Sequence, residues 1–155
     1  MCNYFSCIVT RELKVIWSQK TCNHEDLIRD AKLGDTKLEN RDFVRIEITP
    51  KTDKPTRNQD DWNYREDEEC TLPEWYAKNI GKILTVVWAS WKESVAFQLV
   101  MEREQREGTD TYFFAIDSSK VVARGSSKVV ARGSSTVDAR DSSKVVAWDS
   151  STVDA

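Results

Sequence analysis

From Tyr112 to Ala155 the chain is a tandem repeat of an eight-residue unit, and no other feature limits the possible folds as strongly. The units read YFFAIDSS, KVVARGSS, KVVARGSS, TVDARDSS, KVVAWDSS and TVDA. Their second residue is always Phe or Val and their fourth is always Ala. Residues two apart share one face of a strand, and Gly/Asp-Ser-Ser is a turn sequence. The repeat therefore predicts a short β-solenoid in which the valine and alanine columns point inward.

The true period of the repeat is predicted to be sixteen residues rather than eight. The last four units alternate between K-V-V-A and T-V-D-A. In a coil of two strands and two turns, stacked about 4.7 Å from the next, this alternation gives two unlike outer walls. One wall would carry Lys128 and Lys144, and the other Thr136, Asp138, Thr152 and Asp154. The alternative is a disordered, Ser-rich segment of mixed charge, against which the fixed valine column argues.

An ordered solenoid would present two surfaces to partners. The first is a basic wall of Lys128, Arg132, Lys144 and Trp148. The second is the last coil with Val153 and Ala155, because an open strand edge invites pairing. We therefore expect a homodimer through the last coil, or a chain shortened from a longer repeat.

Residues Ala131 to Asp138, A-R-G-S-S-T-V-D, resemble the A-x-x-[GS]-S-T-[LV]-x repeats of bacterial ice-nucleation proteins and related sixteen-residue β-solenoids. The resemblance implies the solenoid fold for the tail. Ice binding in that family goes with Thr-x-Thr ladders, and Lys-Val-Val or Thr-Val-Asp stands here instead, so ice activity is not expected. The part before the repeat resembles small uncharacterised phage or gut-bacterial proteins in general make-up, which implies an inhibitor of host defence as one version of a binding function.

The residues before the repeat predict an α+β domain. Tyr4 to Ser18 alternates like a β-hairpin, and Asn23 caps a short helix with an acidic first turn. Asp42 to Thr49 is a half-buried strand, and Trp62 to Arg65 resumes the sheet. The expected fold is a small antiparallel sheet with helices on one face.

Two helices are expected to close this domain. Thr71-Leu72-Pro73-Glu74 is the start of the first, which carries Trp75 and Tyr76. Apolar residues recur at helical spacing from about Ile80 to Glu107, which predicts a long amphipathic helix. The chain then divides into an α+β domain, 1–108, and a solenoid of octapeptide repeats, 109–155.

Charge and cysteine content narrow the class of protein. The formal net charge of -3 opposes non-specific binding of nucleic acid or an anionic membrane. No apolar run is long enough to span a bilayer and no signal peptide opens the chain, so a cytoplasmic protein is expected. The spacing of Cys7, Cys22, His24 and Cys70 matches no common zinc site, and we expect reduced thiols, no metal and no cofactor.

Two constellations in the first domain carry possible chemistry. His24 with Glu25 and Asp26 offers either a general base or an ordinary helix start. Aromatic residues offer either a pocket for a planar ligand, with Arg45 on its phosphate, or a packed core; they are Trp62, Trp75, Trp88, Trp91, Tyr64 and Tyr76. The acidic run from Glu66 to Glu69 is interpreted as a solvated face rather than a cation site.

The chain contains no glycine-rich phosphate loop, nucleophile elbow or dinucleotide fingerprint. We therefore expect a non-enzymatic binding and assembly protein, whose first domain recognises a protein or small ligand and whose solenoid mediates oligomerisation. The alternative is a nucleotide or small-molecule binding domain, or an enzyme, that uses the aromatic pocket with His24. A third hypothesis, nucleic-acid binding through the basic wall and Trp148, is opposed by the acidic total charge.

Overall fold

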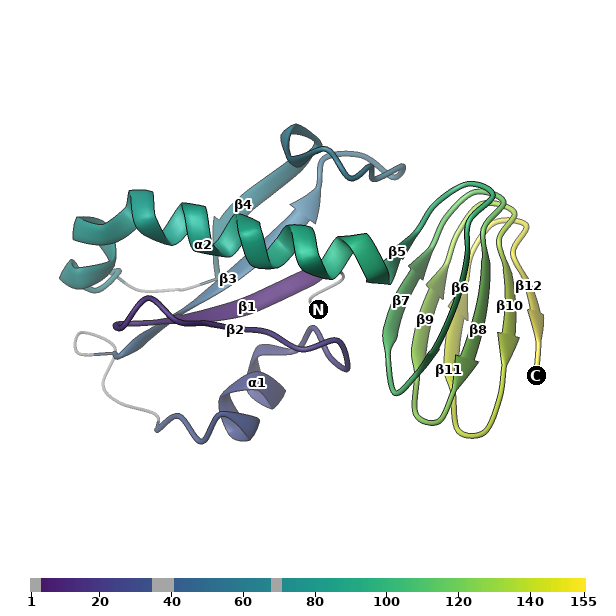
Figure 1. Cartoon of the computed structure of the whole chain (residues 1–155), viewed down its shortest axis with the longest axis horizontal. Coiled ribbons are helices and arrows are strands. Elements are labelled where there is room, and N and C mark those ends of the chain that lie inside the picture. The colour runs from purple at the N-terminus through teal and green to yellow at the C-terminus, as the bar shows by residue number, and fades with distance from the viewer. Residues whose placement is uncertain (1–3, 35–40, 68–70) are drawn as a thin grey trace. The chain divides into compact units, whose positions relative to one another are not determined.

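A computed structural model of the chain describes residues 4–34, 41–67 and 71–155. It divides the chain into two compact units (Figure 1). The first comprises residues 1–18 and 22–93, and the second comprises residues 19–21 and 94–155. The predicted fold class, an α+β domain followed by a β-solenoid, is confirmed. Cys2, Cys70, Glu68 and Glu69 lie outside the described residues.

The first unit is built on a four-stranded antiparallel sheet with the strand order β2-β1-β3-β4. Each predicted strand is present. The short helix is also present, with the Asn23 side chain accepting the Glu25 N–H. The elements are β1 (Phe5–Thr10), β2 (Val15–Ile16), α1 (His24–Asp30), β3 (Phe43–Pro50), a 3₁₀ turn (Gln59–Asp61), β4 (Trp62–Glu66) and α2 (Glu74–Gln98).

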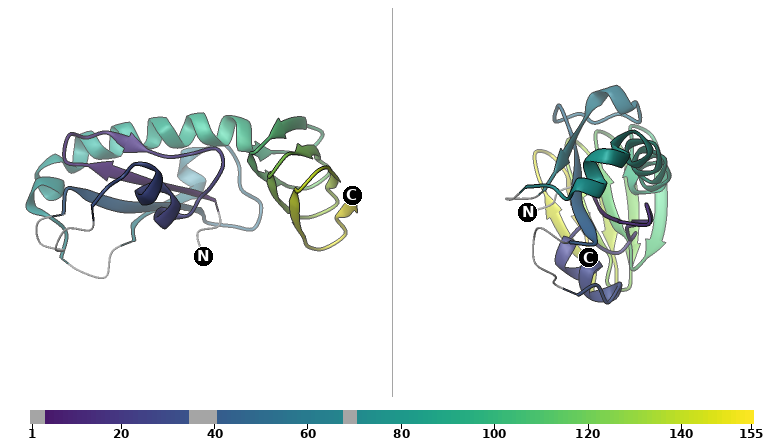
Figure 2. Two further views of the ribbon diagram at one scale, coloured as in Figure 1. Left: turned by 90° about the horizontal axis from the view of Figure 1, so that it is seen from below. Right: turned by 90° about the vertical axis from the view of Figure 1, so that its left-hand side faces the viewer.

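The two helices of this unit cover opposite faces of the sheet, as the left view of Figure 2 shows, so the expectation of helices on one face was wrong. On the α1 face, Leu27 packs with Ile8 and Phe43. On the other face, Tyr64 of β4 meets Tyr76 of α2. Every residue of β1 is buried, because both faces of this strand are covered.

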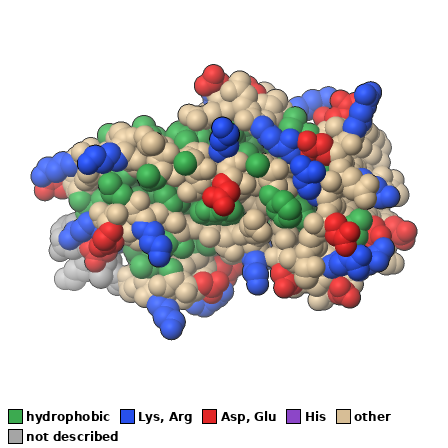
Figure 3. Space-filling view, in the orientation of Figure 1, with side chains coloured by type: hydrophobic (Ala, Val, Ile, Leu, Met, Phe, Trp, Pro, Cys, Tyr) green, Lys and Arg blue, Asp and Glu red, His purple; other side chains and the backbone are tan. Residues whose placement is uncertain are grey.

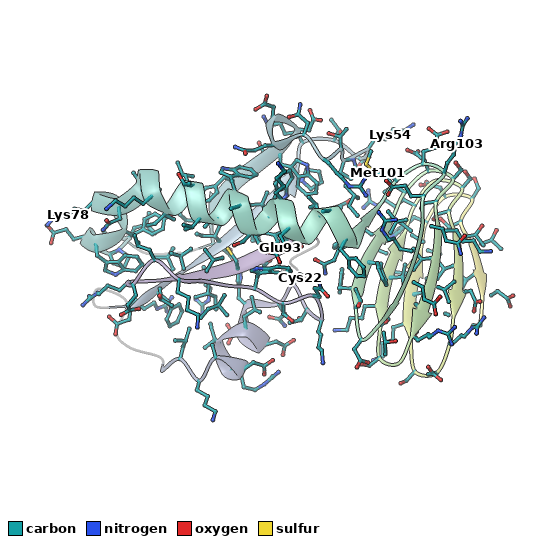
Figure 4. The ribbon with its side chains drawn as sticks, viewed as in Figure 1. Cys22, Lys54, Lys78, Glu93, Met101 and Arg103 are labelled. Carbon is teal, nitrogen blue, oxygen red and sulfur yellow. The ribbon has the colours of Figure 1, made fainter. Side chains whose placement is uncertain are left out.

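The two helices predicted after β4 form one continuous helix, α2, which begins at the predicted first start, Glu74. The helix ends at Gln98 instead of continuing to Glu107. The next residues form β5 (Leu99–Val100), a turn in which the Glu104 N–H donates to the Met101 carbonyl, and β6 (Gln105–Thr109). Figure 4 places Met101 and Arg103 in this turn. Pairing with later strands overrides the helical propensity of the charged segment, since Gln105–Thr109 forms a parallel ladder with Lys120–Arg124.

The second unit is a two-sided parallel β-solenoid of about four coils with a sixteen-residue spacing, as the alternation predicted. Each coil contributes one strand to each of two sheets. The strand orders are β11-β9-β7-β5 in one sheet, here called the odd sheet, and β12-β10-β8-β6 in the even sheet. The remaining strands are β7 (Tyr112–Ala115), β8 (Lys120–Arg124), β9 (Lys128–Ala131), β10 (Thr136–Ala139), β11 (Lys144–Ala147) and β12 (Thr152–Asp154).

The valine and alanine columns form the solenoid core, as predicted. The buried cluster contains Phe113, Val121, Val129 and Val137 from the second position of the unit, and Ala115, Ala123 and Ala131 from the fourth. The second serine of the unit also points inward, since Ser119, Ser127 and Ser135 are buried. Small side chains at all three positions allow the two sheets to approach closely.

Each turn within the octapeptide repeat contains one residue in the left-handed region, always at the sixth position of the unit. These residues are Asp117, Gly125, Gly133, Asp141 and Asp149, with φ between 52° and 68°. Glycine adopts this conformation freely and Asp tolerates it better than most residues. Carboxylates of neighbouring coils then cap the glycines, because Asp141 accepts the Gly125 N–H at 2.9 Å and Asp149 accepts the Gly133 N–H at 3.1 Å.

We predict that alanine at Gly133 lowers the stability of the solenoid, whereas alanine at Gly81 does not. Gly133→Ala puts a Cβ 3.0 Å from the Asp117 backbone in a residue with φ +68°, so we expect it to destabilise the solenoid by about 1–3 kcal/mol. Gly81→Ala is the control, because its Cβ meets nothing within 4 Å and it lies in α2, where alanine adds up to about 1 kcal/mol. Thermal denaturation and amide exchange of β9 and β10 measure both. Equal effects of the two substitutions would contradict this account of the turn.

Candidate functional site

His24 is a buried structural residue at the start of α1. Its side chain is 5% exposed. Its Nε2 lies 3.1 Å from the Ile46 carbonyl oxygen, and its Nδ1 lies 3.2 Å from an Asp67 oxygen. Both partners are acceptors, so each ring nitrogen faces a group to which an N–H can donate. The ring thereby connects α1 to β3 and to the segment after β4.

Ion pairs surround this histidine on the α1 side of the sheet. Arg65 pairs with buried Glu47 and lies 3.7 Å from Asp67, and Arg45 lies 3.3 Å from Glu25. The expected phosphate ligand Arg45 is therefore already engaged by a carboxylate. The network holds charged groups in place around His24.

The aromatic residues of the other face form a ladder of edge-to-face contacts. Ring centroids lie 5.6 Å apart for Tyr4–Trp62, 5.3 Å for Trp62–Trp91 and 5.2 Å for Trp88–Trp91. Such contacts add about 0.5–1.5 kcal/mol per pair beyond burial. Trp62 and Trp91 are only 3% and 2% exposed, so their faces are occupied by other side chains of the core.

The other predicted ligand residues lie apart from this ladder. Trp75 contacts Tyr76 and donates its indole N–H to the Arg41 carbonyl at 2.9 Å. Arg45 and His24 belong to the α1 face, on the far side of the sheet from Trp88 and Trp91. The structure thus brings Trp62, Trp88 and Trp91 together but places Arg45 and His24 on the other face of the sheet. The predicted ligand pocket would have needed all of these residues on one side.

Tyr64 and Tyr76 form a hydrogen-bonded pair between β4 and α2. Their hydroxyl oxygens lie 2.6 Å apart, and Tyr76 donates to Glu66 at 3.0 Å. Burial raises the pKa of both phenols above the ordinary value of 10.0. Both groups therefore remain protonated at neutral pH and serve as hydrogen-bond partners rather than as bases.

Cys7 is a fully buried thiol in β1, facing the α2 side of the sheet. Burial raises its pKa far above the ordinary value of 9.0, which opposes formation of the nucleophilic thiolate. Cys22 is also buried. Within residues 4–34, 41–67 and 71–155, no group of three His, Cys, Asp or Glu side chains is placed to hold a metal ion.

The outer face of the odd sheet carries the predicted basic wall. Lys128 and Lys144 are directly paired across neighbouring strands. Arg132 and Trp148 each follow one of these strands, and their N–H groups donate to Ala115 and Ala131 of the preceding coils. These four residues, here called the lysine wall, therefore share one face. Lys128 and Lys144 form no ion pair with any residue that the structure describes.

The outer face of the even sheet neutralises its own charges. Arg140 donates two hydrogen bonds to Asp138, at 3.0 and 2.7 Å, which lowers the pKa of that carboxyl. Arg124 likewise bonds Glu107 of the neighbouring coil at 2.6 Å. Figure 3 shows basic and acidic side chains interspersed on the visible part of the solenoid. Over the last four units the walls differ at the third position, which is Val130 or Val146 in the odd sheet and Asp138 or Asp154 in the even sheet. The earlier strand β8 of the even sheet has Val122 at this position.

The last coil, here called the terminal coil, consists of β11 and β12, which are the outermost strands of their sheets. Lys144 and Trp148 donate their N–H groups to the preceding coil, as does Thr152. Because strand residues alternate, the N–H and C=O groups of Val145, Ala147 and Val153 point away from that coil. Val146, Trp148 and Val153 are also 52%, 56% and 40% exposed, so the coil presents both an open backbone edge and apolar side chains.

Of the residues in the terminal coil, Lys144, Trp148, Val153 and Ala155 were predicted from the sequence as candidates for an interaction surface; Lys128 and Arg132, also predicted, lie one coil earlier. The edge-facing backbone groups of Val145 and Ala147, and the exposed Val146, were not predicted. The alternation of the repeat could have predicted them. In β11 and β12 the residues whose side chains point inward are also those whose N–H and C=O groups point to the open edge.

Comparison with protein-family models, curated proteins and solved structures returns no match to this chain. No helix in the described part of the chain has the length and apolar character needed to cross a bilayer.

The position of His24 predicts that its removal weakens the fold. His24→Ala deletes a buried ring and leaves the Ile46 carbonyl and Asp67 without this partner, so we expect a loss of about 2–4 kcal/mol. Arg29→Ala, in the same helix but with its side chain 69% exposed, serves as the control and is expected to stay close to wild type. Urea denaturation measures both variants. A silent His24→Ala would show that the ring does not hold α1 to the sheet.

Proposed function

We propose that this chain is a non-enzymatic binding and assembly protein whose solenoid joins it to other protein chains, including copies of itself, through the terminal coil. The observation that carries this proposal is the coincidence of two open strand edges with three exposed apolar side chains in that coil. Strand addition at an open edge is a general mode of protein recognition. The first unit serves as a rigid folded body, since its two candidate polar sites are occupied by internal contacts.

The edge and the apolar side chains act together in this proposal. Backbone groups at an edge are solvated, so pairing them gains little net energy and mainly fixes the register. The energy comes from covering Val146, Trp148 and Val153, at roughly 25 cal/mol for each Å² of apolar surface removed from water. Trp148 is well suited to this role, because Trp is enriched among residues that dominate interface energies.

The lysine wall is a second surface of the solenoid, and we propose that it binds an acidic segment of a protein partner. Lys128 and Lys144 stand opposite each other in neighbouring strands, an arrangement in which like charges repel. An anionic segment would relieve this repulsion. The wall also carries the apolar column of Val130 and Val146 between its cations, which suits acidic peptides with apolar side chains better than a nucleic-acid backbone.

The terminal coil predicts self-association that proline blocks. The mass in sedimentation velocity is expected to rise with concentration in the wild type. Ala147→Pro removes an N–H that faces the edge without removing a hydrogen bond to β9, and should weaken association by about tenfold. Ala147→Ser keeps the N–H and is the matched control. A wild-type chain that remains monomeric at near-millimolar concentration would refute assembly through this coil.

We predict that the lysine wall binds an acidic peptide, and that the affinity depends on the charge of this wall rather than on the total charge of the protein. A glutamate-rich peptide with apolar residues is expected to bind in a salt-sensitive manner, and Lys128→Glu should weaken it by about tenfold. Lys120→Glu changes the charge equally on the other wall and should have little effect. Isothermal titration calorimetry reports the binding. Tighter binding of a single-stranded oligonucleotide than of the peptide would favour nucleic acid as the partner instead.

A further inference from the structure

We infer that two copies of the chain pair through their terminal coils about a two-fold axis, with β11 of each copy antiparallel to β12 of the other and Lys144 facing Asp154 of the second copy. This inference rests on the proposed assembly function and specifies its partner and register. The backbone, the side-chain alternation and the charges of the terminal coil each support the same arrangement.

The backbone supports it through the direction of the free groups. Val145 of β11 and Val153 of β12 both point their N–H and C=O groups away from the preceding coil. Placed opposite each other in an antiparallel pair, these two valines exchange both hydrogen bonds. Lys144 and Asp154 then form a non-hydrogen-bonded pair, the kind in which facing side chains lie closest.

The alternation of side chains supports the same register. Val145 and Ala147 belong to the inward columns of β11, and Val153 and Ser151 belong to those of β12. Opposing Val145 to Val153 also opposes Ala147 to Ser151, so every inward residue meets an inward residue. A slip by one residue would set inward side chains against outward ones. The core of one solenoid thereby continues into the core of the other.

The charges select this register among those that keep the alternation. Opposing Val145 to Val153 places Lys144 opposite Asp154 and Val146 opposite Thr152. The two-fold axis repeats the contact, so two pairs of opposite charge form. A slip by two residues loses both pairs, and pairing β11 with β11 would oppose Lys144 to Trp148 without any acidic residue of that strand to match it.

Each chain on its own holds like charges in register at these positions. Lys144 stands beside Lys128, and Asp154 stands beside Asp138. The second copy supplies the opposite charge that each coil lacks at its own edge. The contact is small, two short strand edges per copy, and therefore fits a weak dimer with micromolar rather than nanomolar affinity.

Charge reversal tests the arrangement on the full chain. Lys144→Asp and Asp154→Lys each turn two attractive contacts into two repulsive ones, and each should raise the dimer dissociation constant by about tenfold or more. Neither harms the fold of its own chain, because Lys144→Asp replaces a repulsion from Lys128 by an attraction and Asp154→Lys does the same with respect to Asp138. Lys128→Asp, one coil in from the edge, is the control and should leave dimerisation nearly unchanged.

Two rescue measurements make the test specific. An equimolar mixture of the two single variants should form a heterodimer, because every reversed charge then meets its opposite, and the double variant should recover a homodimer. Sedimentation velocity across a concentration series compares the wild type, the two single variants, their mixture and the double variant. Wild-type dimers that charge reversal does not weaken, or that neither mixture nor double variant restores, would overturn the pairing while leaving assembly intact. A monomeric wild type would overturn the proposed function as well, and masses beyond a dimer would indicate head-to-tail stacking instead.

Discussion

The parallel ladder that joins residues sixteen apart is the interaction on which the solenoid depends. It places Val129 beside Val145 and Val121 beside Val137, so a column of small inward side chains becomes a continuous core. A single octad has too little apolar surface to fold, and stacking supplies the missing surface. The ladder also explains why α2 ends at Gln98. Leu99 and Val100 pair with Phe114 and Ala115, and this pairing outweighs the helical preference of the charged residues that follow.

Regular patterns in the sequence predicted the solenoid and the strands well. The fixed valine column predicted the core, and the alternation of Val and Asp at the third position predicted two unlike walls, which Val130 and Asp138 occupy. Asn23 predicted the start of α1, because its cap is a local interaction. In each case the signal lies within a few residues of the structure that it specifies.

Features set by distant contacts could not be predicted in the same way. The placement of α1 and α2 on opposite faces depends on which side of β1 each helix covers, and β1 is buried on both. Likewise the spacing of Trp88 and Trp91 fits a pocket or a core equally well. Only the contacts with residues far away in sequence, Trp91 with Trp62 and Trp88 with Tyr64, distinguish a packed ladder. The helix end at Gln98 belongs to the same class, since a strand partner more than ten residues away decides it.

The residue at the third position of the repeat unit affects both the charge pairing within each wall and the surface that the wall presents to partners. Aspartate at the third position lets the even wall neutralise its cations internally, through Arg140 and Asp138. Valine at the same position leaves the odd wall cationic, with Lys144 beside Lys128. The two kinds of unit meet once inside the stack, in the even sheet, where Lys120 stands beside Thr136 and its charge helps to lower the pKa of Asp138. In the terminal coil, Lys144 and Asp154 each stand beside a like charge of their own wall instead. The proposed dimer is the arrangement that would set these two residues opposite each other.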